Sequence, residues 1–258
     1  MRRLPVAFIT VGILLTLQAF PVFSAEITIL GNDYKPPKYY LEYGKPKGIL
    51  IDILRSIDQE TEHSFAIRLY PWKRAYLMAA DGKGGIVGLS KTTERLKIFD
   101  YSDVIYYDEL LLVVLKGHEF PYEKIEDLAG KRVGVRRGSS YGDAYERGKQ
   151  EIFTIDEDTT SVGRLYKLLA QRIDVAIIGP GKAGFNNVLR NNPALMQHKD
   201  AFVVLKKPFM VDPNYLGFAK TMHMQDFLQE FNRILHKKYK DGTVQRVIDT
   251  YMKQAGTD

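Results

Sequence analysis

The segment from Gly85 to Asp103, GIVGLSKTTERLKIFDYSD, holds the residues best suited to bind an anion. A short apolar run ends in Gly88, Ser90 opens a small polar segment, and Arg95 follows about one helical turn later. This order predicts a buried strand that ends in a turn with free backbone amides. Free amides at a helix start and a forked guanidinium together bind a carboxylate. Arg95, Ser90 and Gly88 are therefore candidate ligand-binding residues; a solvated helix arginine is the alternative.

A second turn, Gly138-Ser-Ser-Tyr-Gly142, follows an expected strand and matches the G-x-S-x-G pattern of hydrolase nucleophile elbows. Both late histidines belong to expected helices, His236 inside one and His223 at the start of another. No HGGG-like oxyanion segment precedes the serines. We therefore expect Ser140 and Arg136 to contact a bound ligand, without hydrolase chemistry.

The segment Gly179-Pro-Gly-Lys-Ala-Gly184 matches G-x-G-x-x-G. In a dinucleotide site, an acidic residue ends the next strand, about 20 residues on, to hold the ribose. Here the next expected strand, 202–205, ends in Lys206-Lys207. We interpret the segment as a strand-to-helix turn and expect no cofactor.

Two aromatic residues are candidates for the walls of a ligand pocket. Trp72 is the only tryptophan and follows Pro71 at an expected strand-to-helix turn, and Tyr34 follows the first expected strand. Both residue types are also common in ordinary cores. Asp33, beside Tyr34, is a candidate acidic ligand, with a surface turn as the alternative.

Composition excludes several classes of function. The 37 basic and 31 acidic residues leave a small positive surplus, spread over the chain, which does not predict a nucleic-acid partner. The five histidines stand far apart, without a pair at helical spacing, so no metal site is expected. The chain has no cysteine and hence no disulfide or lipid-anchor site.

Residues 1–24 predict a cleaved secretory signal peptide. Arg2 and Arg3 precede an apolar stretch, and small residues follow Pro21. An uncleaved anchor is the alternative, but Gln18 and Pro21 shorten the apolar stretch below the ~20 residues that a membrane span needs. We expect the mature protein in the periplasm.

Alternating strands and helices must position these residues. The apolar and alternating patterns predict strands at 26–31, 64–70, 86–87, 110–115, 131–136, 174–178 and 202–205, and helices at 48–57, 72–80, 143–150, 161–170, 183–191, 224–240 and 242–252. This alternation is typical of an α/β protein whose parallel sheets carry helices on both faces.

Six segments in order resemble family 3 of the solute-binding proteins, the periplasmic receptors that usually serve amino-acid ABC importers. They are GKPKGILIDIL (44–54), PWKRA (71–75), SKTTERLKIFDYSD (90–103), LAGKRVGVRRGSSY (128–141), RIDVAII (172–178) and DGTVQRVIDTYM (241–252). The resemblance implies a type II periplasmic binding protein, with two Rossmann-like lobes joined by crossover strands at 110–115 and 202–207. Lobe 1 would comprise 25–112 and 208–258, and lobe 2 would comprise 113–207.

The resemblance also implies roles in the site. Arg95 matches the arginine that clamps a ligand carboxylate, Trp72 a pocket wall, and Asp33 an acid seen in many receptors for cationic amino acids. In many amino-acid-binding members an Asp after the strand 174–178 pairs with the ligand's α-ammonium, whereas this chain has Gly179. Either another acid such as Asp33 serves, or the ligand is not an ordinary α-amino acid.

The expected function is therefore a monomeric, non-enzymatic receptor that closes over a small carboxylate-bearing ligand, an amino acid or related organic acid, and serves an inner-membrane ABC permease. Two alternatives follow from the same resemblance. One is an exported enzyme similar to cyclohexadienyl dehydratases, and the other is a ligand-sensing receptor for a membrane kinase.

Overall fold

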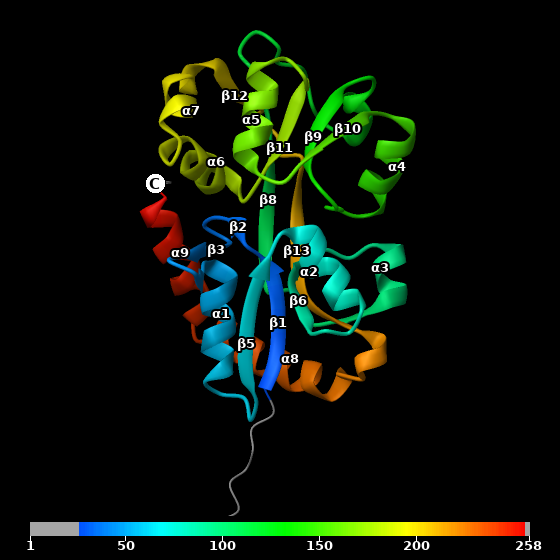
Figure 1. Cartoon of the computed structure of the whole chain (residues 1–258), viewed down its shortest axis with the longest axis vertical. Helices are drawn as coiled ribbons and strands as arrows, with labels where there is room; N and C mark the ends of the chain where they lie inside the picture. Colours follow the sequence, from blue (N-terminus) through cyan, green and yellow to red (C-terminus); the bar gives the residue numbers. More distant parts are fainter. Residues whose placement is uncertain (1–25, 256–258) are drawn as a thin grey trace, which may run out of the picture.

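The computed structural model describes residues 26–255 and has two α/β lobes, stacked along the long axis of the molecule (Figure 1). The predicted signal peptide lies outside the described residues. Within residues 26–255, no helix has the length and apolar character needed to cross a membrane.

Lobe 1 is built on the parallel strands β6, β1 and β5. Alternate residues of β1 enter different cores: Ile29 packs on one face with α1 and α8, and Leu30 packs on the other with α2. The elements of this lobe are β1 (Glu26–Asn32), β2 (Tyr34–Lys35), β3 (Tyr39–Glu42), β4 (Lys45–Lys47), α1 (Ile49–Asp58), β5 (Ser64–Tyr70), α2 (Trp72–Ala80), β6 (Gly85–Leu89), α3 (Thr93–Ile98), β7 (Phe99–Tyr101), the 3₁₀ turn Lys220–Met222, α8 (Gln225–Lys240) and α9 (Thr243–Gln254).

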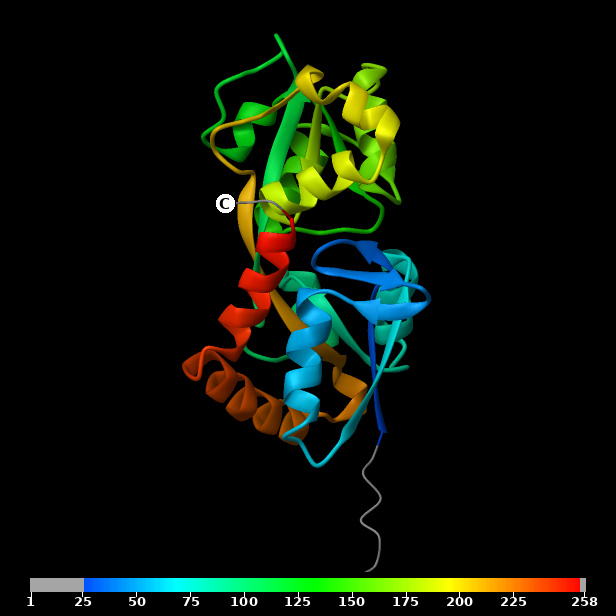
Figure 2. The same ribbon diagram turned by 90° about the vertical axis from the view of Figure 1, so that its left-hand side faces the viewer.

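Lobe 2 has the parallel strands β10, β9 and β11 at its centre. Its elements are the 3₁₀ turn Ile125–Leu128, β9 (Arg132–Arg136), α4 (Asp143–Glu151), β10 (Thr154–Asp158), α5 (Ser161–Leu169), β11 (Val175–Ile178), α6 (Gly181–Arg190), α7 (Pro193–Gln197), the 3₁₀ turn Lys199–Ala201 and β12 (Phe202–Val204). Figure 2 shows α9 rising from lobe 1 beside α6 of this lobe.

Two long antiparallel strands, β8 (Tyr106–Leu115) and β13 (Met210–Ala219), join the lobes into the sheet order β10-β9-β11-β8-β13-β6-β1-β5. Leu112 of β8 enters one core of lobe 2 and Val113 enters the other. This strand is therefore buried on both faces, as its continuous apolar run predicts. Because β8 and β13 both pass between the lobes, they are the natural hinge of the molecule.

One crossover prediction is wrong. The run 202–207 does not return to lobe 1: β12 pairs with β8 inside lobe 2, and the return strand is β13. The sequence hid β13 because Asp212, Pro213 and Asn214 interrupt its apolar pattern. The division of lobes at residues 112 and 208 stays a prediction.

Candidate ligand-binding cleft

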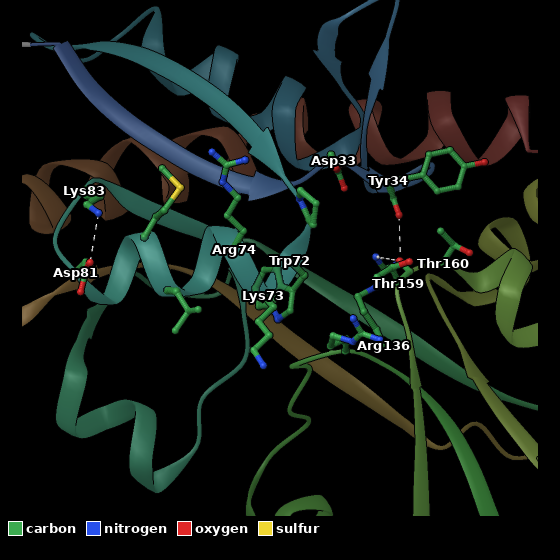
Figure 3. Close-up of a pocket in the computed structure, with 14 residues that line it drawn as sticks. Asp33, Tyr34, Trp72, Lys73, Arg74, Asp81, Lys83, Arg136, Thr159 and Thr160 are labelled. Atoms are coloured by element: carbon green, nitrogen blue, oxygen red, sulfur yellow. Dashed lines mark hydrogen bonds and ion pairs between the residues drawn. The ribbon is translucent and has the colours of Figure 1, made fainter.

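Two adjoining cavities lie between the lobes. The outer groove, about 680 Å³, is bounded by Asp33 and Tyr34, by α2 from Trp72 onward, and by Arg136 and the turn 159–160 (Figure 3). The inner pocket, about 20 Å³, is lined by Lys35, Lys38, Tyr39, Gly88, Ser90, 139–141 and Asp212. Trp72 and Arg136 line both cavities, so the two form one cleft.

The structure brings seven of the eight predicted residues to this cleft. Gly88, Ser90, Trp72, Arg136 and Ser140 line the inner pocket, and Asp33 and Tyr34 line the outer groove. Residues far apart in the sequence therefore line one cleft. β6 and α2 contribute from lobe 1, and β9 and the turn after it contribute from lobe 2.

Arg95 is not among the described residues that line either cavity. Its side chain is buried inward, 5% exposed, with Nη1 donating to the Ser90 carbonyl at 3.2 Å and the guanidinium 5.1 Å from the centre of the Tyr76 ring. The alternative of a solvated helix arginine is therefore wrong. The role of Arg95 as a carboxylate clamp stays a prediction.

The end of β6 is shaped for close approach. Gly88 has φ +81°, a backbone conformation that favours glycine. A Cβ there would also lie 2.7 Å from the Tyr39 ring, so both the backbone and the lack of space exclude a side chain at this position. Two residues on, Ser90 Oγ donates to Asp212 Oδ2 at 2.6 Å. This bond fixes the hydroxyl at the pocket wall against the return strand.

Arg136, at the end of β9, reaches across the cleft. Its Nη1 donates to Asn32 Oδ1 at 3.0 Å and its Nη2 to the Tyr34 carbonyl at 3.1 Å, both in lobe 1. A further bond, at 3.2 Å, reaches the Thr159 carbonyl of its own lobe. All three acceptors are neutral, and burial lowers the pKa of this guanidinium. A buried cation with neutral partners only is suited to receive an anion.

The sequence analysis missed an ionic cluster beneath the pocket. Lys35 Nζ and Lys38 Nζ both bind Asp108 Oδ2, at 2.6 and 2.8 Å, and Asp108 is fully buried. The available signal was a charged residue inside an apolar strand: Asp108 interrupts β8, and Asp212, its register partner, interrupts β13. Charged residues at such positions are rare unless paired.

The cluster sets the charge state of the pocket. Burial lowers the pKa of Lys35 to about 8, against the attraction of Asp108, with Lys38 and Arg136 lowering it further. For Lys38, burial disfavours the ammonium, but Asp108 outweighs that effect and the pKa is raised. Burial raises the pKa of Asp212. Lys38 thus carries the permanent charge, and Lys35 is the titratable one.

Gly179 now has a structural explanation. A Cβ at this position would lie 2.7 Å from the Leu110 side chain, 2.9 Å from Asp108 Oδ1 and 3.3 Å from Lys35 Nζ. The ionic cluster occupies the space into which a side chain at 179 would project. An acid at this position and the buried Lys35–Asp108 pair are therefore mutually exclusive.

Further contacts join the lobes at the rim of the cleft. Trp72 Nε1, from lobe 1, donates to the Gly138 carbonyl of lobe 2 at 3.2 Å. At the start of α3, Thr93 donates through its backbone amide and Oγ1 to the Asp143 carboxylate, at 2.9 and 2.7 Å. Asp143 begins α4, so two helix starts meet across the cleft.

Residues 27–254 match the profile of the bacterial extracellular solute-binding proteins, family 3. The chain belongs to this family. It is 24% identical over 232 residues to the L-cystine-binding protein TcyJ of Escherichia coli K12, covering 86% of this chain and 80% of that protein.

Solved structures show the same fold. A histidine kinase sensor domain similar to periplasmic binding proteins superposes with a TM-score of 0.73 at 18% identity, covering 89% of this chain and 96% of that one. An L-arginine-bound substrate-binding protein, AbpA of Streptococcus pneumoniae, gives 0.70 at 20% identity, covering 90% and 96%. The predicted type II periplasmic-binding-protein fold is confirmed.

Proposed function

We propose that this family 3 protein is a monomeric periplasmic receptor that captures a small carboxylate-bearing solute between its lobes and presents it to an inner-membrane ABC permease. The observation that carries the proposal is the convergence of side chains from both lobes on one cleft. Arg136, for example, donates hydrogen bonds to both lobes, to Asn32 of lobe 1 and to the Thr159 carbonyl of lobe 2. The carboxylate-bearing ligand, an amino acid or related organic acid, also agrees with the names of the relatives.

Hinge bending at β8 and β13 explains how capture works. Opening separates Arg136 from Asn32 and Tyr34, and closure over a solute lets both lobes contact it at once. Closure also excludes water, and a charge–charge attraction is several times stronger in such a site than in bulk solvent. The expected affinity therefore depends on residues of both lobes.

Binding without catalysis is favoured by the state of the two acids at the inner pocket, Asp108 and Asp212. A dehydratase needs a carboxylic acid within hydrogen-bond reach of a leaving hydroxyl. Asp108 is held by two lysines, and Asp212 accepts bonds from Ser90 and Asn214. Both acids are thus committed to the protein itself.

The test is a thermal-shift screen of the mature protein with amino acids, mono- and dicarboxylates, followed by calorimetry of each hit. We expect at least one carboxylate-bearing solute to bind, and Arg136→Gln to weaken it more than tenfold, as loss of a buried charged contact does. Arg233→Gln, an exposed position on α8, is the charge-matched control and keeps full affinity. Absence of binding by every carboxylate-bearing compound would contradict the proposal.

A further inference from the structure

The inner pocket is built with a surplus of positive charge. Lys35, Lys38 and Arg136 line it. The two lysines share one carboxylate oxygen of Asp108, and Arg136 has no carboxylate partner among residues 26–255. Burying a cation without a counter-charge is costly, so the cluster is stabilised when an anion enters.

The acids of the pocket leave no place for a ligand ammonium. Asp108 Oδ2 holds two ammonium groups. Its Oδ1 has no hydrogen-bond partner among the described residues, but it is buried against Gly179, and Asp108 is not among the residues that line the pocket. Asp212 Oδ2 accepts from Ser90 Oγ at 2.6 Å and from Asn214 Nδ2 at 3.0 Å. Lys35 itself thus occupies the position beside Asp108 where a ligand amine would find its counter-charge.

The outer groove extends the positive field. Lys73, Arg74 and Arg137 line it, and the acid Asp33 faces them there. Arg136 lines the groove as well, and the remaining charged residues there, Asp81 and Lys83, pair with each other at 3.3 Å. Cationic side chains therefore outnumber acidic ones in the outer groove as well as in the inner pocket.

The inner pocket also contains one unpaired hydrogen-bond donor. Ser140 Oγ is buried and has no hydrogen-bond partner among the described residues. A buried hydroxyl without a partner costs about 1–3 kcal/mol, which a ligand oxygen would recover. Ser140 lies in the turn after β9 and lines the same pocket as Arg136, so the two can contact one ligand group.

We infer that the cleft selects a small dicarboxylate without an amino group, with one carboxylate toward Lys35, Arg136 and Ser140 and the second toward Lys73 and Arg74 of the outer groove. The inference rests on the proposed receptor function and names the solute class. Of the two alternatives that Gly179 leaves open, it favours a ligand that is not an ordinary α-amino acid, because Lys35 supplies beside Asp108 the cation that such a ligand would bring.

Matched pairs of ligands test this inference directly. Succinate and aspartate, and glutarate and glutamate, differ only by an α-ammonium group. In calorimetric titrations of the mature protein at pH 7, we expect the dicarboxylate of the better-fitting pair to bind at least tenfold more tightly. If the amino acid of each pair binds equally or more tightly, the inference fails while the receptor function stands. If no carboxylate-bearing compound binds, both fail.

A variant gives a second, independent readout. Lys35→Ala removes one ammonium and leaves Asp108 paired with Lys38, so no buried charge is stranded. We expect the ratio of dicarboxylate to amino-acid affinity to fall at least tenfold, because Asp108 then has room for a ligand amine. Lys116→Ala, at an exposed position just beyond β8, is the control and leaves the ratio unchanged. An equal loss of affinity for both ligands of a pair would show a structural role only and overturn the assignment.

Discussion

Lys35 and Lys38 are three residues apart and share Asp108, but they differ in what they contribute. Lys38 is almost fully buried, and Asp108 raises its pKa, so this pair resembles a fixed structural contact. Lys35 lies at the pocket surface, and burial lowers its pKa to about 8. An anion bound beside Lys35 would raise this pKa again. Of the two lysines, Lys35 is the one whose charged form the fold stabilises less, and it is also the one placed to contact a ligand.

A pH series on the unliganded protein tests this difference. Between about pH 8 and the unfolded lysine value near 10.4, the unfolded chain holds the Lys35 proton and the folded protein does not. The free energy of unfolding contributed by Lys35 therefore rises with pH across this window. We expect the wild type to gain about 2 kcal/mol relative to Lys35→Met between pH 7.5 and 9.5, in urea denaturation. Tyrosine ionisation is common to both proteins and cancels; a constant difference would contradict the lowered pKa.

At the scale of elements, the starts of α3 and α4 form a latch across the cleft. The Asp143 carboxylate accepts two bonds from Thr93 and its pKa is lowered by them. The contact is solvent-exposed, so the contribution of each bond is modest. Because the two residues belong to different lobes, the latch acts on the open–closed equilibrium more than on folding.

Removing the latch is expected to weaken ligand capture. Asp143→Ala should lower affinity about three- to tenfold, mainly through faster dissociation, with little change in melting temperature. Stopped-flow dissociation of the bound solute measures the effect. Glu146→Ala, on the same helix and paired only within it to Lys149, is the matched control. Equal dissociation rates in the two variants would show that the latch does not hold the lobes.

The same elements show what the sequence could and could not predict. β5 and α2 begin and end where their sequence patterns predict, and the buried residues of α2, Trp72, Ala75 and Ala79, follow the helical period. β13 was not predicted, because Asp212, Pro213 and Asn214 interrupt its apolar pattern. These residues are accommodated through the pairing of β13 with β8 and the bond between Asp212 and Ser90. The roles of Lys35 and Lys38 were not predicted either, because their partner Asp108 is about 70 residues away in the sequence. Local pattern determines elements, and distant pairing determines the charge of the site.

For the whole molecule, the cleft is a boundary between the lobes that a hinge at β8 and β13 would open. The two lobes keep separate apolar cores, so opening exposes mainly polar contacts such as those of Arg136 and Asp143. Such contacts exchange with water at small net cost. The free energy of closure can therefore be supplied by a small solute, as capture requires.

Trp72 provides a reporter of this motion, because the chain has no other tryptophan. The indole is 7% exposed, and its Nε1 donates across the cleft to Gly138 at 3.2 Å. Opening would break that bond and hydrate the ring, which moves the emission to longer wavelength and increases quenching by acrylamide. We expect Asp143→Ala to show both changes and a bound solute to reverse them, with Glu146→Ala unchanged. Emission that is indifferent to a solute whose binding calorimetry has established would contradict closure at the Trp72 wall.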